Sequence, residues 1–168
     1  MLGIDPGLSR CGYGCVRKVG HRLHATAAGV IMTSPSDRLE LRLVTLYHEL
    51  VELMKELAPG TVVVERVLFQ TNARTAMSVG QASGVAMVAA VEAGCNVAQY
   101  SANEVKQAVV GYGSATKAQV QQMVMRLLAM DEEPRPPDVA DALALAFCHL
   151  SSQPLTDAVR RSGKGSRG

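Results

Sequence analysis

The 168-residue chain is predicted to form an α/β domain, in which helices cover both faces of a mixed, five-stranded sheet. Two strands carry this prediction, Leu2–Asp5 and Thr61–Glu65, because each is mainly apolar and each ends in a carboxylate. The continuous valines of the second are typical of a parallel strand that is buried on both faces. Composition agrees with this class, since 48% of residues are hydrophobic, only 4% are aromatic and none is Trp.

The first three strands are expected to form an antiparallel meander. Residues 11–16 and 23–32 alternate small or apolar residues with polar ones, which is the period of a strand. Gly20 lies between them and suits a tight turn.

An amphipathic helix is predicted between the meander and the strand that ends at Glu65. Leucines recur at spacings of four and three from Leu39 to Leu57. Asp37 and Glu40 give the signature of an N-terminal cap, and Pro59 and Gly60 end the helix.

Residues 72–92 are predicted to form a second helix, which is apolar almost all round and includes Gly80 and Gly84. Such a helix must be covered on both sides. It therefore lies either at the centre of the domain or in an interface with a second subunit, and small residues suit close packing in both cases.

A fifth strand and two helices are predicted next. Residues 96–100 form the strand, and Ser101 to Glu104 is a capping box that begins a short helix carrying Lys106. The following helix, over 116–129, has Lys117 in its first turn, where the helix dipole disfavours a cation. Lys117 therefore either contacts an anion or extends into solvent.

The last predicted helix begins at Pro137 and runs to Leu150. Beyond Ser151 the composition turns to Ser, Gly, Arg and Lys, with no acid after Asp157. We expect one folded domain over residues 1–151 and a basic, disordered tail over 152–168.

Charge and cysteine content narrow the class of protein. The net charge is only +2, so the basic character is local rather than general. No apolar run approaches the roughly 18 residues that span a membrane, and no leader pattern follows Met1. The cysteines lack the spacing of a metal site and are interpreted as thiols of a reducing compartment: Cys11, Cys15, Cys95 and Cys148. We expect a cytoplasmic protein that does not contact a membrane.

Four carboxylates are the candidate metal ligands. Asp5 and Glu65 end strands, whereas Asp138 and Asp141 are three residues apart on one helix and share a face. Asp5 alone could be a turn-opening residue ahead of Pro6, and Asp138 a first-turn acid that complements the helix dipole. If the four converge, each like-charge pair about 5 Å apart costs roughly 3 kcal/mol at an effective dielectric constant of about 20. Bound cations must then neutralise them, and all-oxygen ligands favour Mg²⁺ or Mn²⁺.

Two such ions in one site indicate hydrolysis of phosphodiesters, because a pair of metals activates the attacking water and stabilises the leaving oxygen. A nucleic-acid substrate needs basic side chains along its approach. Lys106, Lys117 and the basic tail can supply these phosphate contacts.

Several motifs in this order resemble the bacterial Holliday-junction resolvase family, RuvC, over residues 1–149. They are Gly3-Ile4-Asp5-Pro6-Gly7, Glu65 at a strand end, Val105-Lys106-Gln107, residues 113–120 and residues 138–144.

The resemblance implies an RNase H-like fold, a homodimer and a structure-specific endodeoxyribonuclease. Such an enzyme resolves four-way junctions with two symmetric, Mg²⁺-dependent nicks during DNA recombination and repair, together with the branch-migration proteins RuvA and RuvB. It also implies catalytic, metal-binding roles for the carboxylates and DNA-binding roles for the lysines: Asp5, Glu65, Asp138 and Asp141, and Lys106 and Lys117. Two equivalent sites suit a substrate with twofold symmetry.

The chain departs from the family pattern at two places. The family usually has an aromatic residue, used for stacking at the junction, three positions after the strand-end glutamate; here that position is Leu68, and Phe69 follows it. Either residue is therefore a candidate for DNA contact. The first strand also has fewer residues before Asp5 than is usual.

Three other functions compete with this one. An ATP-binding domain of the actin and sugar-kinase type also uses a Gly-Ile-Asp-x-Gly turn, but it needs a second lobe for which 168 residues leave no room. A nuclease of the same fold that acts on RNA is the nearest enzyme rival. An inactive junction-binding protein would show an altered carboxylate, whereas all four are present.

Overall fold

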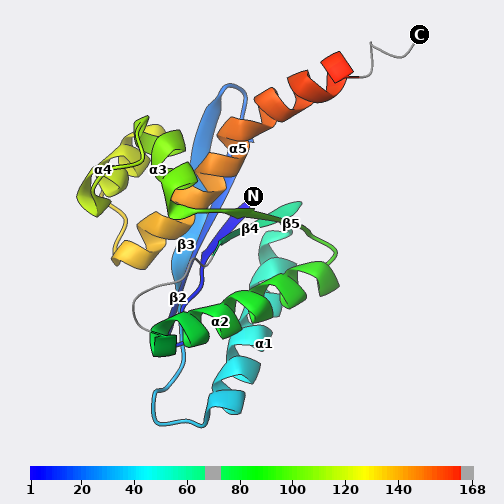
Figure 1. The fold of residues 1–168 in the computed structure, drawn as a ribbon, viewed down its shortest axis with the longest axis vertical. Helices are drawn as coiled ribbons and strands as arrows, with labels where there is room; N and C mark the ends of the chain where they lie inside the picture. Colours follow the sequence, from blue (N-terminus) through cyan, green and yellow to red (C-terminus); the bar gives the residue numbers. More distant parts are fainter. Residues whose placement is uncertain (67–72, 164–168) are drawn as a thin grey trace.

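A computed structural model shows a five-stranded sheet with helices on both faces (Figure 1). The structure describes residues 1–66 and 73–163; the side chains of residue 74 and residues 153–163 lie outside this description. In chain order the elements are β1 (Leu2–Asp5), β2 (Arg10–Val19), β3 (Arg22–Met32), α1 (Leu39–Leu57), β4 (Thr61–Glu65), α2 (Ala73–Glu92), β5 (Asn96–Tyr100), α3 (Ala102–Val110), α4 (Lys117–Leu127) and α5 (Pro137–Gly163).

The sheet is mixed, with the order β3-β2-β1-β4-β5. Strands β1, β2 and β3 form the predicted antiparallel meander, and the turn between β2 and β3 uses a positive φ of 61° at Gly20. Strand β4 pairs with β1 in parallel, and β5 pairs with β4 in parallel. Strand β1 is therefore the central strand, with a hydrogen-bonded neighbour on each side.

Alternation along the strands divides the core into two layers. Leu2, Ile4 and Val64 face one side, where α1 and α2 cover the sheet. Val63 faces the other side, where α3, α4 and α5 pack. These two layers account for the helices on both faces that the sequence predicts.

Helix α5 lies close to the sheet because glycines face it. A Cβ added at Gly3 or Gly12 would collide with the backbone of α5, and one at Gly14 would lie 2.7 Å from the side chain of Leu143. The absence of these three Cβ atoms lets the helix backbone approach β1 and β2 directly.

The helix ends differ from prediction at α1. Its N-cap is Arg38, which makes no side-chain capping bond, so the cap predicted from Asp37 and Glu40 is wrong. Glu40 instead pairs with Arg38, at 2.6 Å. Capping boxes do begin α3, as predicted from Ser101 and Glu104, and α4.

Helix α5 continues past residue 151, where the composition changes, and reaches Gly163. The division into a domain over 1–151 and a tail over 152–168 stays a prediction. Within the described residues, no helix has both the length and the apolar character needed to cross a membrane.

Candidate active site

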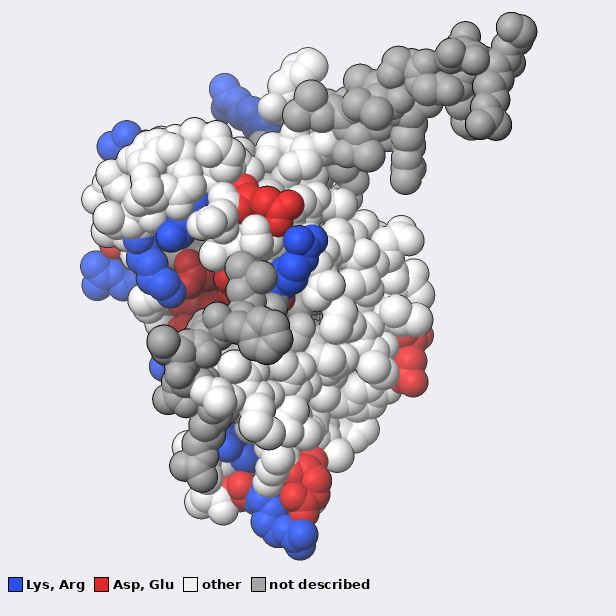
Figure 2. Space-filling view, in the orientation of Figure 1, with Lys and Arg blue, Asp and Glu red and all other residues white. Residues whose placement is uncertain are grey.

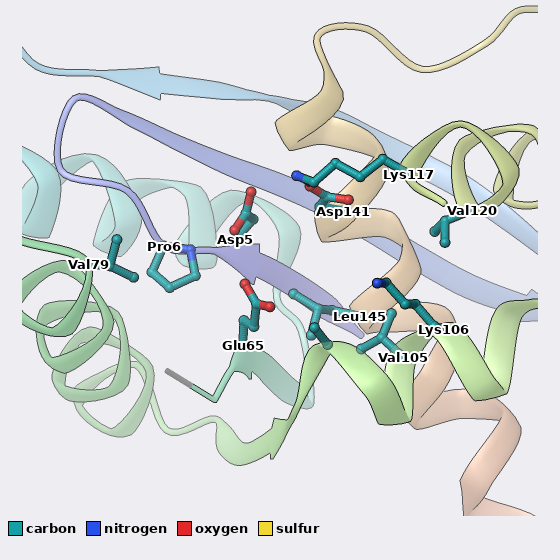
Figure 3. Close-up of a pocket in the computed structure, with 11 residues that line it drawn as sticks. Asp5, Pro6, Glu65, Val79, Val105, Lys106, Lys117, Val120, Asp141 and Leu145 are labelled. Atoms are coloured by element: carbon teal, nitrogen blue, oxygen red, sulfur yellow. The ribbon is translucent and has the colours of Figure 1, made fainter. Parts of the chain in front are cut away.

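Asp5 and Glu65 end neighbouring strands, and both line one cavity of about 380 Å³ (Figure 3). Strands β1 and β4 are parallel, with Ile4 paired to Val64. The carboxyl ends of parallel neighbours lie at the same edge of a sheet, so the two side chains that follow this pair are brought together. The two strand-end carboxylates therefore lie at one cavity, and their role as metal ligands stays a prediction.

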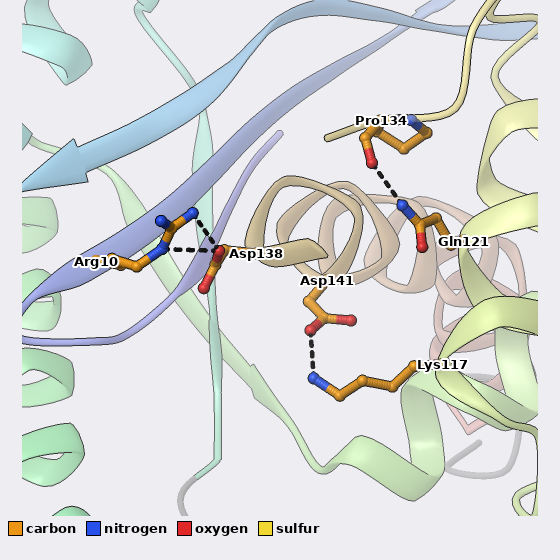
Figure 4. A network of polar contacts seen from close by, with 6 residues as sticks. All are labelled: Arg10, Lys117, Gln121, Pro134, Asp138 and Asp141. Carbon is orange, nitrogen blue, oxygen red and sulfur yellow. Dashed lines mark hydrogen bonds and ion pairs between the residues drawn. The ribbon is translucent and has the colours of Figure 1, made fainter. Parts of the chain in front are cut away.

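Asp141 enters the same cavity from the first turns of α5, whereas Asp138 is not among the residues that line it. Asp138 faces β2, where its Oδ2 accepts hydrogen bonds from Nε and Nη2 of Arg10 at 3.2 and 3.0 Å (Figure 4). The two acids are three residues apart on one helix, but they contact different neighbours.

Two lysines complete the cavity. Lys117, in the first turn of α4, donates from Nζ to Oδ2 of Asp141 at 3.0 Å. The unusual position of this cation in the helix therefore corresponds to a contact with an anion. Lys106 lines the cavity from α3.

The rest of the cavity lining is mainly apolar and comes from Pro6, which follows β1, and from α2, α3, α4 and α5. The complete set of lining residues is Asp5, Pro6, Glu65, Val79, Ala102, Val105, Lys106, Lys117, Val120, Asp141 and Leu145. Apolar walls lower the local dielectric constant, so charges in this cavity act on one another more strongly than they would in water.

The carboxylates of the site perturb one another. Burial, which is the largest cause, and the charges of Asp141, Glu65 and Asp138 together raise the pKa of Asp5 from 3.8 to about 7. Burial and the charge of Asp141 also raise the pKa of Glu65. The hydrogen bond with Asp141 raises the pKa of Lys117. Negative charge at this site is therefore only partly balanced by the basic side chains, and a further cation is favoured.

The donors of this site fit a hard divalent cation, because they are all carboxylate oxygens. They do not form a closed ligand set as they stand: no three acidic, histidine or cysteine side chains of the described residues are close enough together to hold an ion. Arg10 and Lys117 pair with the two acids of α5 instead.

Basic side chains flank the acidic recess on the molecular surface (Figure 2). Two arginines of the described residues were missed by sequence reasoning. Arg10 contacts Asp138, and Arg66, directly after Glu65, donates from Nη2 to the carbonyl oxygen of Gln99 at 3.2 Å. Its place beside a strand-end glutamate was the available signal for Arg66. Leu68 and Phe69, the candidates for stacking on DNA, lie outside the described residues.

Comparison with known proteins identifies the family of this chain. The profile of the family described as Crossover junction endodeoxyribonuclease RuvC matches residues 1–149. The protein of that name from Salinispora arenicola is 52% identical over 151 residues, which cover 89% of this chain and 86% of the relative. The one from Natranaerobius thermophilus is 44% identical over 155 residues, covering 92% and 96%.

Solved structures agree with the sequence relatives. RuvC of Thermus thermophilus in complex with a Holliday junction substrate superposes with a TM-score of 0.87 and 36% identity, covering 92% of this chain and 94% of that one. The yeast mitochondrial Holliday junction resolvase Ydc2 shares the fold, with a TM-score of 0.73 at 13% identity over 98% of this chain and 82% of that one. The predicted RNase H-like fold is confirmed. The chain belongs to the RuvC family of crossover junction endodeoxyribonucleases.

Proposed function

We propose that this protein resolves Holliday junctions by two symmetric, metal-dependent nicks during DNA recombination and repair. The observation that carries the proposal is the convergence of Asp5, Glu65 and Asp141 on one cavity with Lys106 and Lys117. Membership of a family of crossover junction endodeoxyribonucleases supports it.

The four acids would hold the metal, for which we propose two Mg²⁺ ions, with Mn²⁺ as a substitute. Asp5 and Glu65 are fixed by the sheet, and Asp138 and Asp141 by the first turns of α5. Bound ions of this kind supply an activated water and charge neutralisation for in-line displacement at phosphorus.

The lysines would position the DNA strand. With a divalent cation held by Asp141, Lys117 would be free to contact a phosphate oxygen in place of that carboxylate. Lys106 lines the same cavity from α3 and would hold a neighbouring phosphate. Contacts of this kind fix the register of the strand without reading its sequence.

A synthetic four-way junction with one labelled strand tests the proposal. With Mg²⁺ the protein should nick the junction at symmetric positions, and with EDTA it should bind without cutting. Linear duplex and an RNA hairpin are the controls. Preferential cutting of the RNA hairpin would favour the rival function of a nuclease that acts on RNA. Release of phosphate from ATP would favour the ATP-binding domain of the actin and sugar-kinase type.

Asp141→Asn should abolish Mg²⁺-dependent cleavage and keep junction binding, because the change removes a ligand and leaves Lys106 and Lys117 in place. The matched control is Asp131→Asn, which alters an exposed acid ahead of α5. Cleavage by Asp141→Asn at the rate of the control would refute the assigned site.

We further propose a homodimer joined through α2. Apart from Arg74 and Glu92 this helix has no charged residue. Its Met77, Val88 and Val91 side chains are 67%, 54% and 66% exposed. Gly80 and Gly84 fall on the same helical stripe, at spacings of three and four. An isologous contact between two copies of this face would cover it and give the two equivalent sites that symmetric nicking needs.

The cellular setting is also a proposal. The four cysteines are free thiols in this chain, which suits the reducing cytoplasm. RuvA and RuvB are the proposed partners, and stimulation of cleavage on a junction that carries them is the test. Leu68 and Phe69 stay candidates for stacking on the junction, and separate alanine variants of the two would show which one the enzyme needs for cleavage.

A further inference from the structure

Asp138 is held against strand β2 at two points, one on its backbone and one on its side chain. Gly12 makes the first contact and Arg10 the second. These residues are two positions apart on β2, so they face the same side of the sheet, toward α5.

Gly12 is the residue that lets the first turn of α5 lie on the sheet. A Cβ at this position would lie 2.7 Å from the carbonyl carbon of Asp138 and 3.0 Å from its Cβ, and closer still to its carbonyl oxygen. Ordinary contact begins at 3.4 Å, and the obstructing atoms are mainly backbone, which cannot rotate away. Gly12 is also the partner of Asp5 in the β1–β2 ladder. One residue therefore adjoins two of the proposed ligands.

Arg10 fixes the side chain of the same acid. Its Nε and Nη2 both donate to Oδ2 of Asp138, and among the described residues none donates to Oδ1. A planar guanidinium that binds through two nitrogens sets the orientation of a carboxylate as well as its place. The carboxylate is thus oriented before any cation arrives.

We infer that Gly12 and Arg10 are positioning residues for Asp138, which together set its distance and orientation relative to Asp5. The inference rests on the proposed function, in which these two acids hold metal for one reaction. It adds that the geometry of the site is determined partly from strand β2, by residues outside the carboxylate set.

The size of the effect follows from the contact distances. To accept a methyl group at position 12, the first turn of α5 must move away from β2. Ligand constellations are productive only when held within about 0.5 Å of their working geometry. Loss of a group that orients a metal ligand typically reduces metal affinity or activity by about 10–100-fold.

Variants that conserve charge separate positioning from electrostatics. Gly12→Ala and Arg10→Lys leave the net charge of the site unchanged. Their matched controls are Gly60→Ala, where a Cβ meets nothing within 4 Å, and Arg17→Lys, an arginine of the same strand that donates to the carbonyl oxygen of Leu57. The first readout is the Mn²⁺ concentration at the midpoint of the rise in melting temperature, measured on the full chain without DNA. The second is the Mg²⁺ concentration at the midpoint of junction cleavage.

We expect Gly12→Ala to raise both metal midpoints by about tenfold or more. Arg10→Lys should raise them by less, because an ammonium still reaches Asp138 but cannot hold it through two nitrogens. Junction binding in EDTA and both control variants should be unchanged. Should Gly12→Ala fail to fold, Arg10→Lys decides, since it alters only a half-exposed side chain.

Metal midpoints equal to those of the controls would overturn the inference, even if the melting temperature in EDTA fell, because that result indicates packing alone. Failure of the proposed function and failure of the inference give different results in these experiments. A wild-type protein that binds Mn²⁺ but leaves junctions intact would refute the proposed function, and the Mn²⁺ titration would still decide the inference. A wild-type protein that cleaves, with variants that match their controls, would refute the inference alone.

Discussion

Asp5 lies where burial and three other carboxylates act on one side chain, and its pKa of about 7 is the result. Its value in the unfolded chain is near 3.8. Between these two pH values the folded protein binds more protons than the unfolded one, so the stability of the metal-free protein falls as the pH rises from about 4 to about 7. Above that range the ionised carboxylate destabilises the fold, by up to about 4 kcal/mol at about 1.4 kcal/mol per pKa unit.

Asp5→Asn should therefore stabilise the metal-free protein at pH 8 by up to a few kcal/mol and at pH 4.5 by much less, because pH 4.5 is far below the folded-state pKa and the amide carries no charge. Urea unfolding in EDTA at the two pH values measures this difference, with Asp131→Asn as the control. An equal change in the free energy of unfolding at pH 8 and at pH 4.5 would contradict the effect assigned to charge.

At the scale of single residues, the sequence predicted the acids better than their contacts. Asp5 and Glu65 could be placed together because parallel strands end at one edge. Asp138 and Asp141 could be assigned only to one helix face, because their separate contacts with Arg10 and Lys117 depend on how α5 is rotated over the glycines of the sheet. Those contacts join segments more than 20 residues apart, which no local pattern reports.

At the scale of elements, the two ends of α3 and α4 nearest the site are fixed by capping boxes, whereas α1 lacks a side-chain cap. Asp37 and Glu40 matched the capping pattern but did not form it, because the helix begins at Leu39 and not directly after Asp37. A one-residue shift in a helix start lies beyond what periodicity can decide.

Thr116→Ala should lower the free energy of unfolding by about 1 kcal/mol, because the hydroxyl accepts from the backbone N–H of Gln119. Arg38→Ser should raise it by several tenths of a kcal/mol to about 1 kcal/mol by supplying the missing cap of α1. Chemical denaturation of both variants checks the pair. Equal effects of the same sign would show that the caps do not govern these helix ends.

At the scale of the whole molecule, α2 is the element that one chain leaves half covered. The sequence indicated that both faces of this helix must be covered, and one chain covers the face that carries Ala82, Ala86 and Ala89. The sequence could not decide whether the second face of α2 is covered by the same chain or by a second subunit, because the residues of this helix are apolar on nearly every side.

Gly84→Leu should convert the proposed dimer to monomers and leave the chain folded, because a Cβ at Gly84 meets nothing within 4 Å in one chain. Sedimentation velocity measures the association, and circular dichroism the fold. The control is Gly60→Leu, another open position that lies outside α2. A Gly84→Leu dimer as tight as wild type would place the subunit contact elsewhere.

The central place of β1 has a consequence for how the site opens. Its amides are bonded within the sheet between β2 and β4, so they become accessible to solvent only when the sheet itself separates. In native-state deuterium exchange, the amides of Gly3 and Ile4 should report the slowest, global opening, while those near the edges of the sheet exchange earlier. Asp5 would then hold its place until the molecule unfolds as a unit.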